Sequence, residues 1–256
     1  MSMAEQDIIV GLHSIAEALR NPERTHYRLI GTDEGFKELQ RKHGLDPRRQ
    51  DDLRAEFYKP DDFVKQTQEL YRNLGIDYRR IPSGVMLLTS PYEVKNVTWL
   101  YDLCDKESTV KLLILDSVTD GHNAAAILRT ASFFGCNAVV FAQKGSFGVT
   151  SSFARIASGA LEHVPLVQVV SLPKTLSQLA QKNISLVGFS EHAEEPAANA
   201  GEEKIALVLG AEETGLSHAV ERLLTRRVAL HSQGAIKSLN VSVAAAIAME
   251  RCFPKS

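Results

Sequence analysis

The sequence predicts an α/β protein with a parallel sheet in its C-terminal part and a smaller mixed α/β unit before it. From residue 111 onward, short aliphatic runs alternate with stretches whose apolar residues have helical spacing. The runs are nearly continuous in apolar residues, which is typical of parallel strands covered by helices on both faces. The expected strands are 112–115, 138–141, 166–170, 184–189, 205–209 and 227–230, and the expected helices are 123–134, 152–160, 172–181, 216–224 and 241–253.

The N-terminal elements mix strand and helix patterns over shorter lengths. The apolar run 8–10 predicts a strand, and the helix expected at 12–19 places Leu12, Ile15 and Leu19 on one face. The charged segment 46–56 predicts an exposed connection. Further strands are expected at 27–31 and 85–88, and further helices at 33–43 and 61–73. We therefore expect one domain over 1–90, a linker with a short helix over 91–110, and a second domain over 111–256.

Composition excludes several classes of protein. Hydrophobic residues make up 44% of the 256 residues and charged residues 23%, as in ordinary globular proteins. No apolar stretch approaches the ~20 residues that span a bilayer, and the first ten residues lack the features of a signal peptide. The three cysteines are far apart and match no metal-ligand spacing. These features favour a cytoplasmic protein with reduced thiols, no membrane segment and no metal.

Charge gives little support for nucleic-acid binding. The net charge is −2. The segment from Arg20 to Arg49 contains eight basic and five acidic residues, and Arg79 and Arg80 add two adjacent basic residues. Such clusters can contact phosphates, but a solvated helix face explains them equally well. Whether the Arg20–Arg49 cluster touches RNA, and whether 46–56 is ordered, stay open at this point.

Three short segments carry most of the chemical information. Each follows or adjoins an expected strand and mixes Gly, Asn, Ser or acidic residues with aliphatic ones. They are 115–131 (LDSVTDGHNAAAILRTA), 209–216 (LGAEETGL) and 238–244 (SLNVSVA). No P-loop, HExxH or GxGxxG motif is present, and 188–192 lacks the last glycine of a nucleophile elbow.

In the first segment, Asp120 or Asn123 is suited to cap a helix. Arg129 lies in an otherwise apolar helix, so it is expected to face a polar site or to pair with another group. In the second segment, Gly210 permits a close backbone approach and acidic residues suit a helix N-terminus. In the third, Ser238 or Asn240 is suited to cap the following helix, and Asn240 can cap and still belong to a site.

Together, the three segments resemble the signature motifs of the SpoU (TrmH-type) family of SPOUT RNA 2′-O-ribose methyltransferases, closest to the large-subunit rRNA guanosine enzymes. The resemblance implies an S-adenosylmethionine-dependent enzyme that methylates a ribose 2′-hydroxyl, with rRNA as the first substrate and tRNA as the second. It also implies a C-terminal trefoil knot, a homodimer and no metal. Residues 11–19 resemble the opening of the family's substrate-binding domain, so 1–90 would contact RNA.

The resemblance assigns roles to individual residues. Asn123 and Arg129 would hold the target ribose and its phosphate, and Glu212 would form a wall of the site. A guanidinium is a poor general base, so Arg129 is better suited to stabilise a developing alkoxide. The implied catalytic set is Asn123, Arg129, Glu212, Ser238 and Asn240, and the implied donor-binding set is Gly210, Leu230 and Leu239.

Four departures from the family pattern leave an alternative open. Gly121 stands where Pro is usual, Ala125 where Gly is usual, His231 and Ser232 where Pro and Met are usual, and Lys237 where a small or acidic residue is usual. His231 is expected to border the donor pocket. The alternative is a non-catalytic RNA-binding or ribosome-assembly factor that retains the knotted fold. All five implied catalytic residues are present, which favours an active enzyme, although the sequence names neither the RNA nor the nucleotide.

Overall fold

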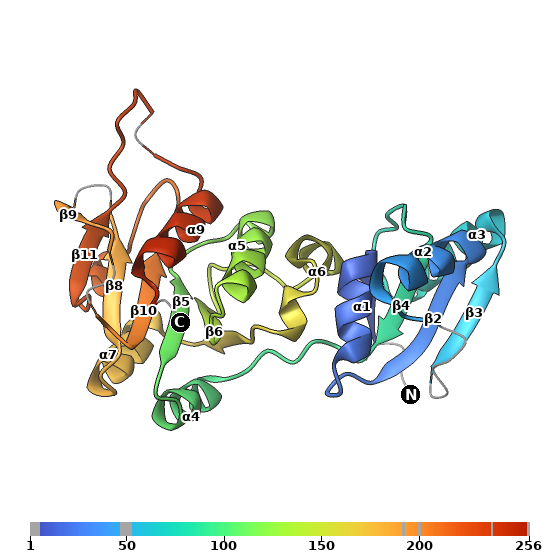
Figure 1. Cartoon of the computed structure of the whole chain (residues 1–256), viewed down its shortest axis with the longest axis horizontal. Helices are drawn as coiled ribbons and strands as arrows, with labels where there is room; N and C mark the ends of the chain where they lie inside the picture. The colour runs from blue at the N-terminus through green and yellow to red at the C-terminus, as the bar shows by residue number, and fades with distance from the viewer. Residues whose placement is uncertain (1–5, 47–52, 191–192, 199–200, 237, 255–256) are drawn as a thin grey trace. The chain divides into compact units, whose positions relative to one another are not determined.

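The computed structural model describes residues 6–46, 53–190, 193–198, 201–236 and 238–254 (Figure 1). Contacts divide the chain into two compact units. The N-terminal unit comprises Met1–Glu93 and Thr150–Glu162, and the C-terminal unit comprises Val94–Val149 and His163–Ser256. Within the described ranges, no helix has both the length and the apolar character needed to cross a bilayer.

The N-terminal unit is built on a four-stranded mixed sheet with the order β1-β4-β2-β3. The central β4 pairs antiparallel with β1 and β2, and β2 pairs parallel with β3. The strands are β1 (Asp7–Val10), β2 (His26–Thr32), β3 (Arg54–Tyr58) and β4 (Val85–Thr89). The helices are α1 (Leu12–Arg20), α2 (Asp33–His43), α3 (Pro60–Asn73), α6 (Ser151–Ala157) and the short 3-10 helix Ala160–Glu162.

Local signals explain these helices. The predicted bounds of α2 are confirmed, because the Thr32 hydroxyl accepts the Gly35 N–H at its start and Gly44 ends it with φ of 69°. Alternate strand residues separate two apolar clusters. Ile9, Leu29 and Leu87 pack with α1 and α2, whereas Ile8, Ile30 and Met86 pack with α3. Both faces of the small sheet are therefore covered.

Two features of this unit differ from the prediction. Residues 54–56 belong to β3 rather than to an exposed connection, because an edge strand tolerates charged residues such as Arg54 and Glu56. Residues 47–52, with Arg48 and Arg49, lie outside the described residues. Segment 150–162 groups with the N-terminal unit although it falls within 111–256, because Glu162 forms a nearly buried ion pair with Arg24 at 2.9 Å.

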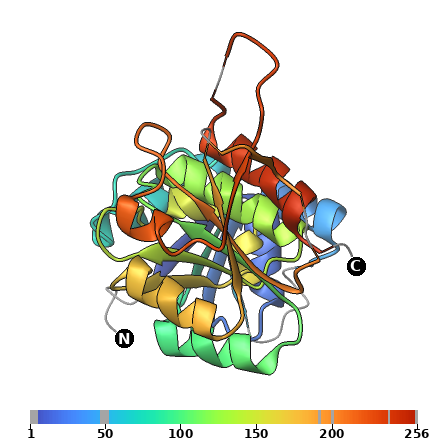
Figure 2. The same ribbon diagram turned by 90° about the vertical axis from the view of Figure 1, so that its left-hand side faces the viewer.

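The C-terminal unit contains a seven-stranded sheet with the order β7-β6-β5-β10-β8-β11-β9, in which every pairing is parallel. The predicted parallel sheet is thus confirmed. The strands are β5 (Val110–Leu115), β6 (Ala138–Ala142), β7 (Leu166–Val169), β8 (Ser185–Phe189), β9 (Glu195–Pro196), β10 (Lys204–Leu209) and β11 (Arg226–Ala229). Helices α4 (Val97–Lys106) and α7 (Leu172–Gln181) cover one face, and α5 (Gly121–Phe133) and α9 (Val241–Cys252) cover the other (Figures 1 and 2).

Several elements of this unit refine the prediction. Helix α4 lies in the predicted linker, yet its Leu100 and Cys104 are buried in the core of the C-terminal unit. The helix expected at 216–224 is reduced to α8 (His218–Glu221), and β9 was not predicted. The trefoil knot stays a prediction of the resemblance.

The three cysteines are free and buried, as expected for structural thiols. Burial raises the pKa of the Cys104 and Cys252 thiols to about 11 and that of Cys136 to about 12. These thiols therefore remain protonated and unreactive near neutral pH.

Candidate active site

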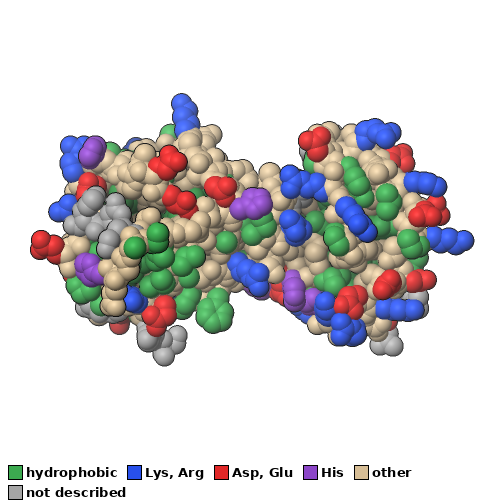
Figure 3. All heavy atoms as spheres, turned by 90° about the horizontal axis from the view of Figure 1, so that it is seen from above, with side chains coloured by type: hydrophobic (Ala, Val, Ile, Leu, Met, Phe, Trp, Pro, Cys, Tyr) green, Lys and Arg blue, Asp and Glu red, His purple; other side chains and the backbone are tan. Residues whose placement is uncertain are grey.

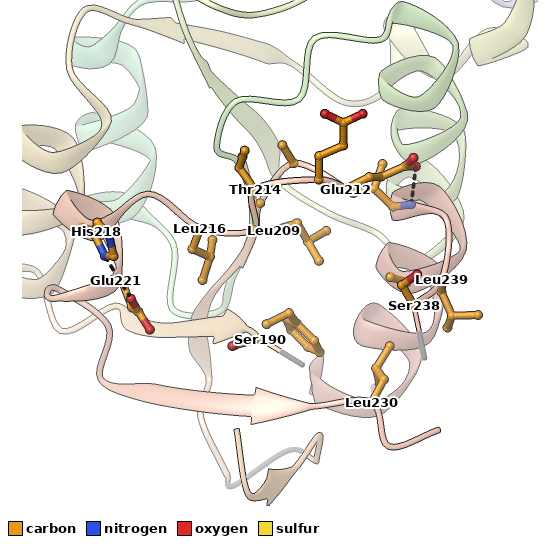
Figure 4. Close-up of a pocket in the computed structure, with 17 residues that line it drawn as sticks. Ser190, Leu209, Glu212, Thr214, Leu216, His218, Glu221, Leu230, Ser238 and Leu239 are labelled. Atoms are coloured by element: carbon orange, nitrogen blue, oxygen red, sulfur yellow. Dashed lines mark hydrogen bonds and ion pairs between the residues drawn. The ribbon is translucent and has the colours of Figure 1, made fainter. Parts of the chain in front are cut away.

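The three sequence motifs meet where the strands of the parallel sheet end. A pocket of about 420 Å³ lies at the carboxyl ends of β8, β10 and β11, which is where open α/β sheets usually bind ligands. Figure 4 shows Glu212, Ser238 and Leu239 on one side of this pocket and His218 and Glu221 on the other. The lining residues are Phe189, Ser190, Leu209–Leu216, His218, Glu221, Leu230, Ser238, Leu239, Val241 and Ala244.

Glu212 is the hydrogen-bonding centre of the site. Its Oε1 accepts from the Asn240 amide at 2.7 Å, from the Val241 backbone N–H at 2.9 Å and from the Asn123 amide at 3.2 Å. The Asn240 amide also donates to Asn123 Oδ1 at 3.0 Å. One carboxylate oxygen therefore joins all three motifs. We call Glu212, Asn123 and Asn240 the Glu212 cluster.

Helix caps set the positions of both asparagines. Asp120 caps α5, because its carboxylate accepts the Asn123 N–H at 2.7 Å, and this leaves the Asn123 side chain free for Glu212. Asn240 caps α9 through Oδ1, which accepts the Ser242 N–H at 2.9 Å, while its amide points to the cluster. Of the two caps considered for each helix, Asp120 and Asn240 are used. The prediction that Asn240 caps this helix is confirmed, and its place in a catalytic site stays a prediction.

Gly210 is required by the loop itself. The loop folds back so that Ala211 and Gly215 exchange backbone hydrogen bonds of 3.2 and 2.9 Å. A Cβ on Gly210 would lie 2.2 Å from the Gly215 carbonyl carbon, so any larger residue would force this turn apart. The close backbone approach predicted at Gly210 is therefore made by the loop, which forms one wall of the pocket.

Asp116 supports the same loop from the first motif. Its carboxylate is 5% exposed and accepts the Ser217 backbone N–H at 2.7 Å. Its own N–H donates to the Leu209 carbonyl at 2.8 Å. Both ends of the loop are thus tied to the end of β5. Sequence reasoning missed Asp116, although an acid placed directly after a buried strand was a usable signal.

Arg129 lies away from the other candidate residues. It is exposed and forms no hydrogen bond or ion pair with any residue that the structure describes. It follows Asn123 by six residues on α5, which is about 9 Å along the helix axis at 1.5 Å per residue. The expectation that Arg129 faces a polar site or pairs with another group is therefore wrong within a single chain.

The remaining candidates divide between the pocket and the cluster. Gly210, Glu212, Leu230, Ser238 and Leu239 line the pocket, whereas Asn123 and Asn240 join it through Glu212. Sequence reasoning missed the wall from the end of β8, Phe189 and Ser190, because the adjoining segment was considered only as a nucleophile elbow.

None of the described departures from the family pattern lines the pocket. Gly121 begins α5 with open space where a Cβ would lie, and Ala125 is fully buried in α5. His231 is exposed and is not among the lining residues, although it directly follows Leu230, which is one of them, so its effect on the donor stays a prediction. Lys237 lies outside the described residues.

The pocket suits S-adenosylmethionine in size and in chemistry. Its volume lies within the usual range for small-molecule sites of about 300–1,000 Å³. Leu209, Leu216, Leu230 and Leu239 give the pocket an apolar wall of the kind that would hold an aromatic ring. Among the described residues, no group of three or more metal-ligating side chains is present.

Comparison with known proteins agrees with this geometry. Residues 111–250 match the model of the SpoU rRNA Methylase family. The chain is 32% identical over 250 residues to the 23S rRNA (guanosine-2′-O-)-methyltransferase RlmB of Ralstonia nicotianae, covering 96% of this chain and 95% of that protein. It is 30% identical over 253 residues to a TrmH-family protein of Staphylococcus aureus, covering 98% and 97% of the two chains.

Solved structures share the fold along nearly the whole chain. A TrmH-family protein from Porphyromonas gingivalis is 26% identical with a TM-score of 0.69, and the match covers 96% of this chain and 88% of that one. The SpoU methyltransferase AviRb from Streptomyces viridochromogenes, solved with S-adenosylmethionine, has a TM-score of 0.72 at 21% identity, with 96% and 89% covered. The second likeness concerns the fold alone.

Proposed function

Because this chain belongs to the SpoU rRNA methylase family, we propose that it is an S-adenosylmethionine-dependent RNA ribose 2′-O-methyltransferase. The observation that carries the proposal is the Glu212 cluster, which brings one residue from each motif to the edge of a pocket that suits the donor. Large-subunit rRNA is the first substrate to test, because the Ralstonia relative acts on 23S rRNA, and tRNA is the second. With such a substrate the protein would act in the cytoplasm.

The chain's own residues supply binding and orientation. When bound, S-adenosylmethionine supplies a methyl group for direct displacement by the ribose 2′-oxygen. The apolar wall holds the donor, and the Asn123 amide, which keeps one N–H beyond its bond to Glu212, provides a neutral hydrogen-bonding group for a ribose hydroxyl. Asn240 positions it, because the two N–H groups of the Asn240 amide go to Glu212 and to Asn123. A guanidinium is a fixed cation with a planar fork of donors, so the role of Arg129 is to hold the phosphate and to stabilise negative charge on the 2′-oxygen.

A second chain would bring Arg129 to such a site. Arg129 forms no hydrogen bond or ion pair with the described residues of its own chain, and it lies one turn from Phe133, which is 83% exposed on α5. Helix α9, which packs on α5, exposes 47% of Val243. We infer a homodimer in which these helices meet and Arg129 serves the partner's site. Light scattering should show a dimer, and Phe133→Glu should give a monomer with greatly reduced methyl transfer.

The proposal is tested by donor binding and by methyl transfer. Titration calorimetry with S-adenosylmethionine should show saturable binding near micromolar, about −8 kcal/mol. Labelled donor and transcribed large-subunit rRNA should then yield a 2′-O-methylated nucleoside identified by mass spectrometry, and Asn240→Ala should abolish it. Absence of both binding and transfer would favour the non-catalytic RNA-binding alternative. The departures from the family pattern are not among the described residues that line the pocket, so the pocket itself gives no support to that alternative.

A further inference from the structure

Most basic side chains of the predicted Arg20–Arg49 cluster are already neutralised by acids. Figure 3 shows acidic and basic side chains interspersed over the N-terminal unit on the face drawn. Lys37 forms no ion pair with a described residue, and the other described members each pair within 4 Å. The pairs are Arg20–Glu17, Arg24–Glu162, Arg28–Glu56, Arg41–Glu38 and Lys42–Glu38. A phosphate would have to displace a carboxylate at each of these five positions, so this cluster is a poor anion site.

A different group of arginines on the same unit has no acidic partner. Arg79, Arg80 and Arg155 are exposed, and none forms an ion pair with a described acid. Arg79 and Arg80 follow α3, whereas Arg155 lies on α6, more than seventy residues along the chain. Guanidinium groups that keep their donors free are the ones available to an incoming anion.

The fold brings Arg79 and Arg155 together, and Arg80 adjoins Arg79 in the chain. The Arg79 guanidinium donates to the Ser152 hydroxyl at 3.3 Å. Ser152 belongs to the first turn of α6, so the Arg79 guanidinium lies beside that turn. Arg155 is three residues from Ser152, so the two side chains are neighbours on one helix face, with Cβ atoms about 5–6 Å apart. The Arg155 stem passes over the start of α1, where its Cγ lies 3.6 Å from the Cβ position of Gly11. We call Arg79, Arg80 and Arg155 the α6 arginine surface.

We infer that the α6 arginine surface binds phosphates of the substrate RNA. This inference rests on the proposed function for the identity of the partner, and on the unpaired guanidiniums for the place of contact. A guanidinium presents a planar fork of donors that matches phosphate oxygens, and backbone phosphates occur at regular intervals along any RNA. The surface therefore adds affinity without reading sequence, while the methylated ribose is selected at the pocket.

Two double variants with the same change in charge test this inference. Arg79→Gln/Arg155→Gln removes two unpaired cations, and Arg20→Gln/Arg41→Gln removes two paired ones. Binding of a fluorescein-labelled transcript of large-subunit rRNA is measured by anisotropy over a range of salt concentrations, with thermal melts to establish that both chains are folded. We expect the first variant to bind roughly five- to tenfold more weakly and its log–log salt slope to fall by about 1.5, and the second to change binding less than twofold.

Equal effects of the two double variants, or no effect of the first, would overturn the inference. The inference would also be overturned if the unaltered chain bound no RNA. A third contrary outcome is that polyglutamate displaces the labelled RNA from the unaltered chain and from the first variant to different extents, because the surface would then take an acidic protein segment. Methyl transfer by the Arg20→Gln/Arg41→Gln chain is measured as well, so that a failure of the RNA-binding inference can be told apart from a failure of the proposed function. If neither this chain nor the unaltered one methylates RNA, the proposed activity fails, whereas the difference in RNA affinity still decides the role of the surface.

Discussion

Removal of the Glu212 carboxylate should damage catalysis far more than stability. In Glu212→Ala, the Asn123 and Asn240 amides and the Val241 N–H lose their shared acceptor. Glu212 is exposed, so water replaces the lost oxygen and each hydrogen bond is worth only about 0.5 kcal/mol to folding. The expected loss in unfolding free energy is about 1.5 kcal/mol, which corresponds to a fall in Tm of roughly 3–6 °C.

The expected effect on kcat is larger because both amides lose their fixed orientation. Misplacement of positioning groups by an ångström costs about 10²-fold in rate, or about 2.7 kcal/mol. Glu212→Gln keeps an oxygen acceptor without the charge, so it should lose roughly tenfold. Initial rates of methyl transfer to transcribed large-subunit rRNA, at saturating donor, measure both variants against Glu213→Ala. Glu213 lies next to Glu212 in the same loop, lines the same pocket, and makes no side-chain hydrogen bond to a described residue.

Two outcomes would refute this reasoning. If Glu212→Ala kept kcat within twofold of the Glu213→Ala control, the cluster would have no part in the reaction. If Glu212→Gln were as inactive as Glu212→Ala at equal stability, the charge itself, rather than the fixed orientation of the amides, would be the contribution of Glu212.

Four further predictions concern the Gly210 loop, Asp116, the Arg24–Glu162 ion pair and the buried thiols. Gly210→Ala should weaken S-adenosylmethionine binding more than tenfold by calorimetry, because its Cβ would lie 2.2 Å from the Gly215 carbonyl carbon. Asp116→Ala should lower donor affinity and speed hydrogen exchange in the loop, since a buried acceptor is lost, and unchanged exchange would contradict this. Arg24→Ala should reduce the unfolding free energy by about 3–5 kcal/mol in urea titrations, because the buried Glu162 carboxylate loses its ionic partner and keeps, among the described residues, only the Asn21 amide. The raised pKa values of the three buried thiols contribute stability that is fully present below about pH 9 and is lost as pH rises toward 11, so urea midpoints should fall over that range.

The fold was largely predictable because burial leaves a strong pattern in the sequence. Five of the six predicted strands lie inside the large sheet, and mostly apolar runs mark all six within one or two residues. Strands β3 and β9 were missed because edge strands need no such run. β3 carries Arg54 and Glu56, and β9 has only two residues, one of them Pro196.

The candidate site was predictable in its residues but not in its connections. Motif order indicated that Asn123, Glu212 and Asn240 belong together, yet the hydrogen bond from Asn123 to Glu212 spans 89 positions. Spacing along the chain carries no information about distances between loops until the strand order is known. Arg129 shows the converse limit. An apolar helix around it suggested a polar partner, but its exposure cannot be read from that pattern.

The borders of the seven-stranded sheet bear on how the protein behaves at high concentration. An uncovered edge strand offers a row of free N–H and C=O groups on which other chains can assemble into aggregates. At β7, the backbone of Lys95 already exchanges hydrogen bonds with Leu166 and Gln168, at 2.9 and 3.0 Å. At the opposite border, β9 is two residues long and Pro196 has no N–H to offer. A wide, strongly apolar sheet can thus remain a poor template for intermolecular β-assembly.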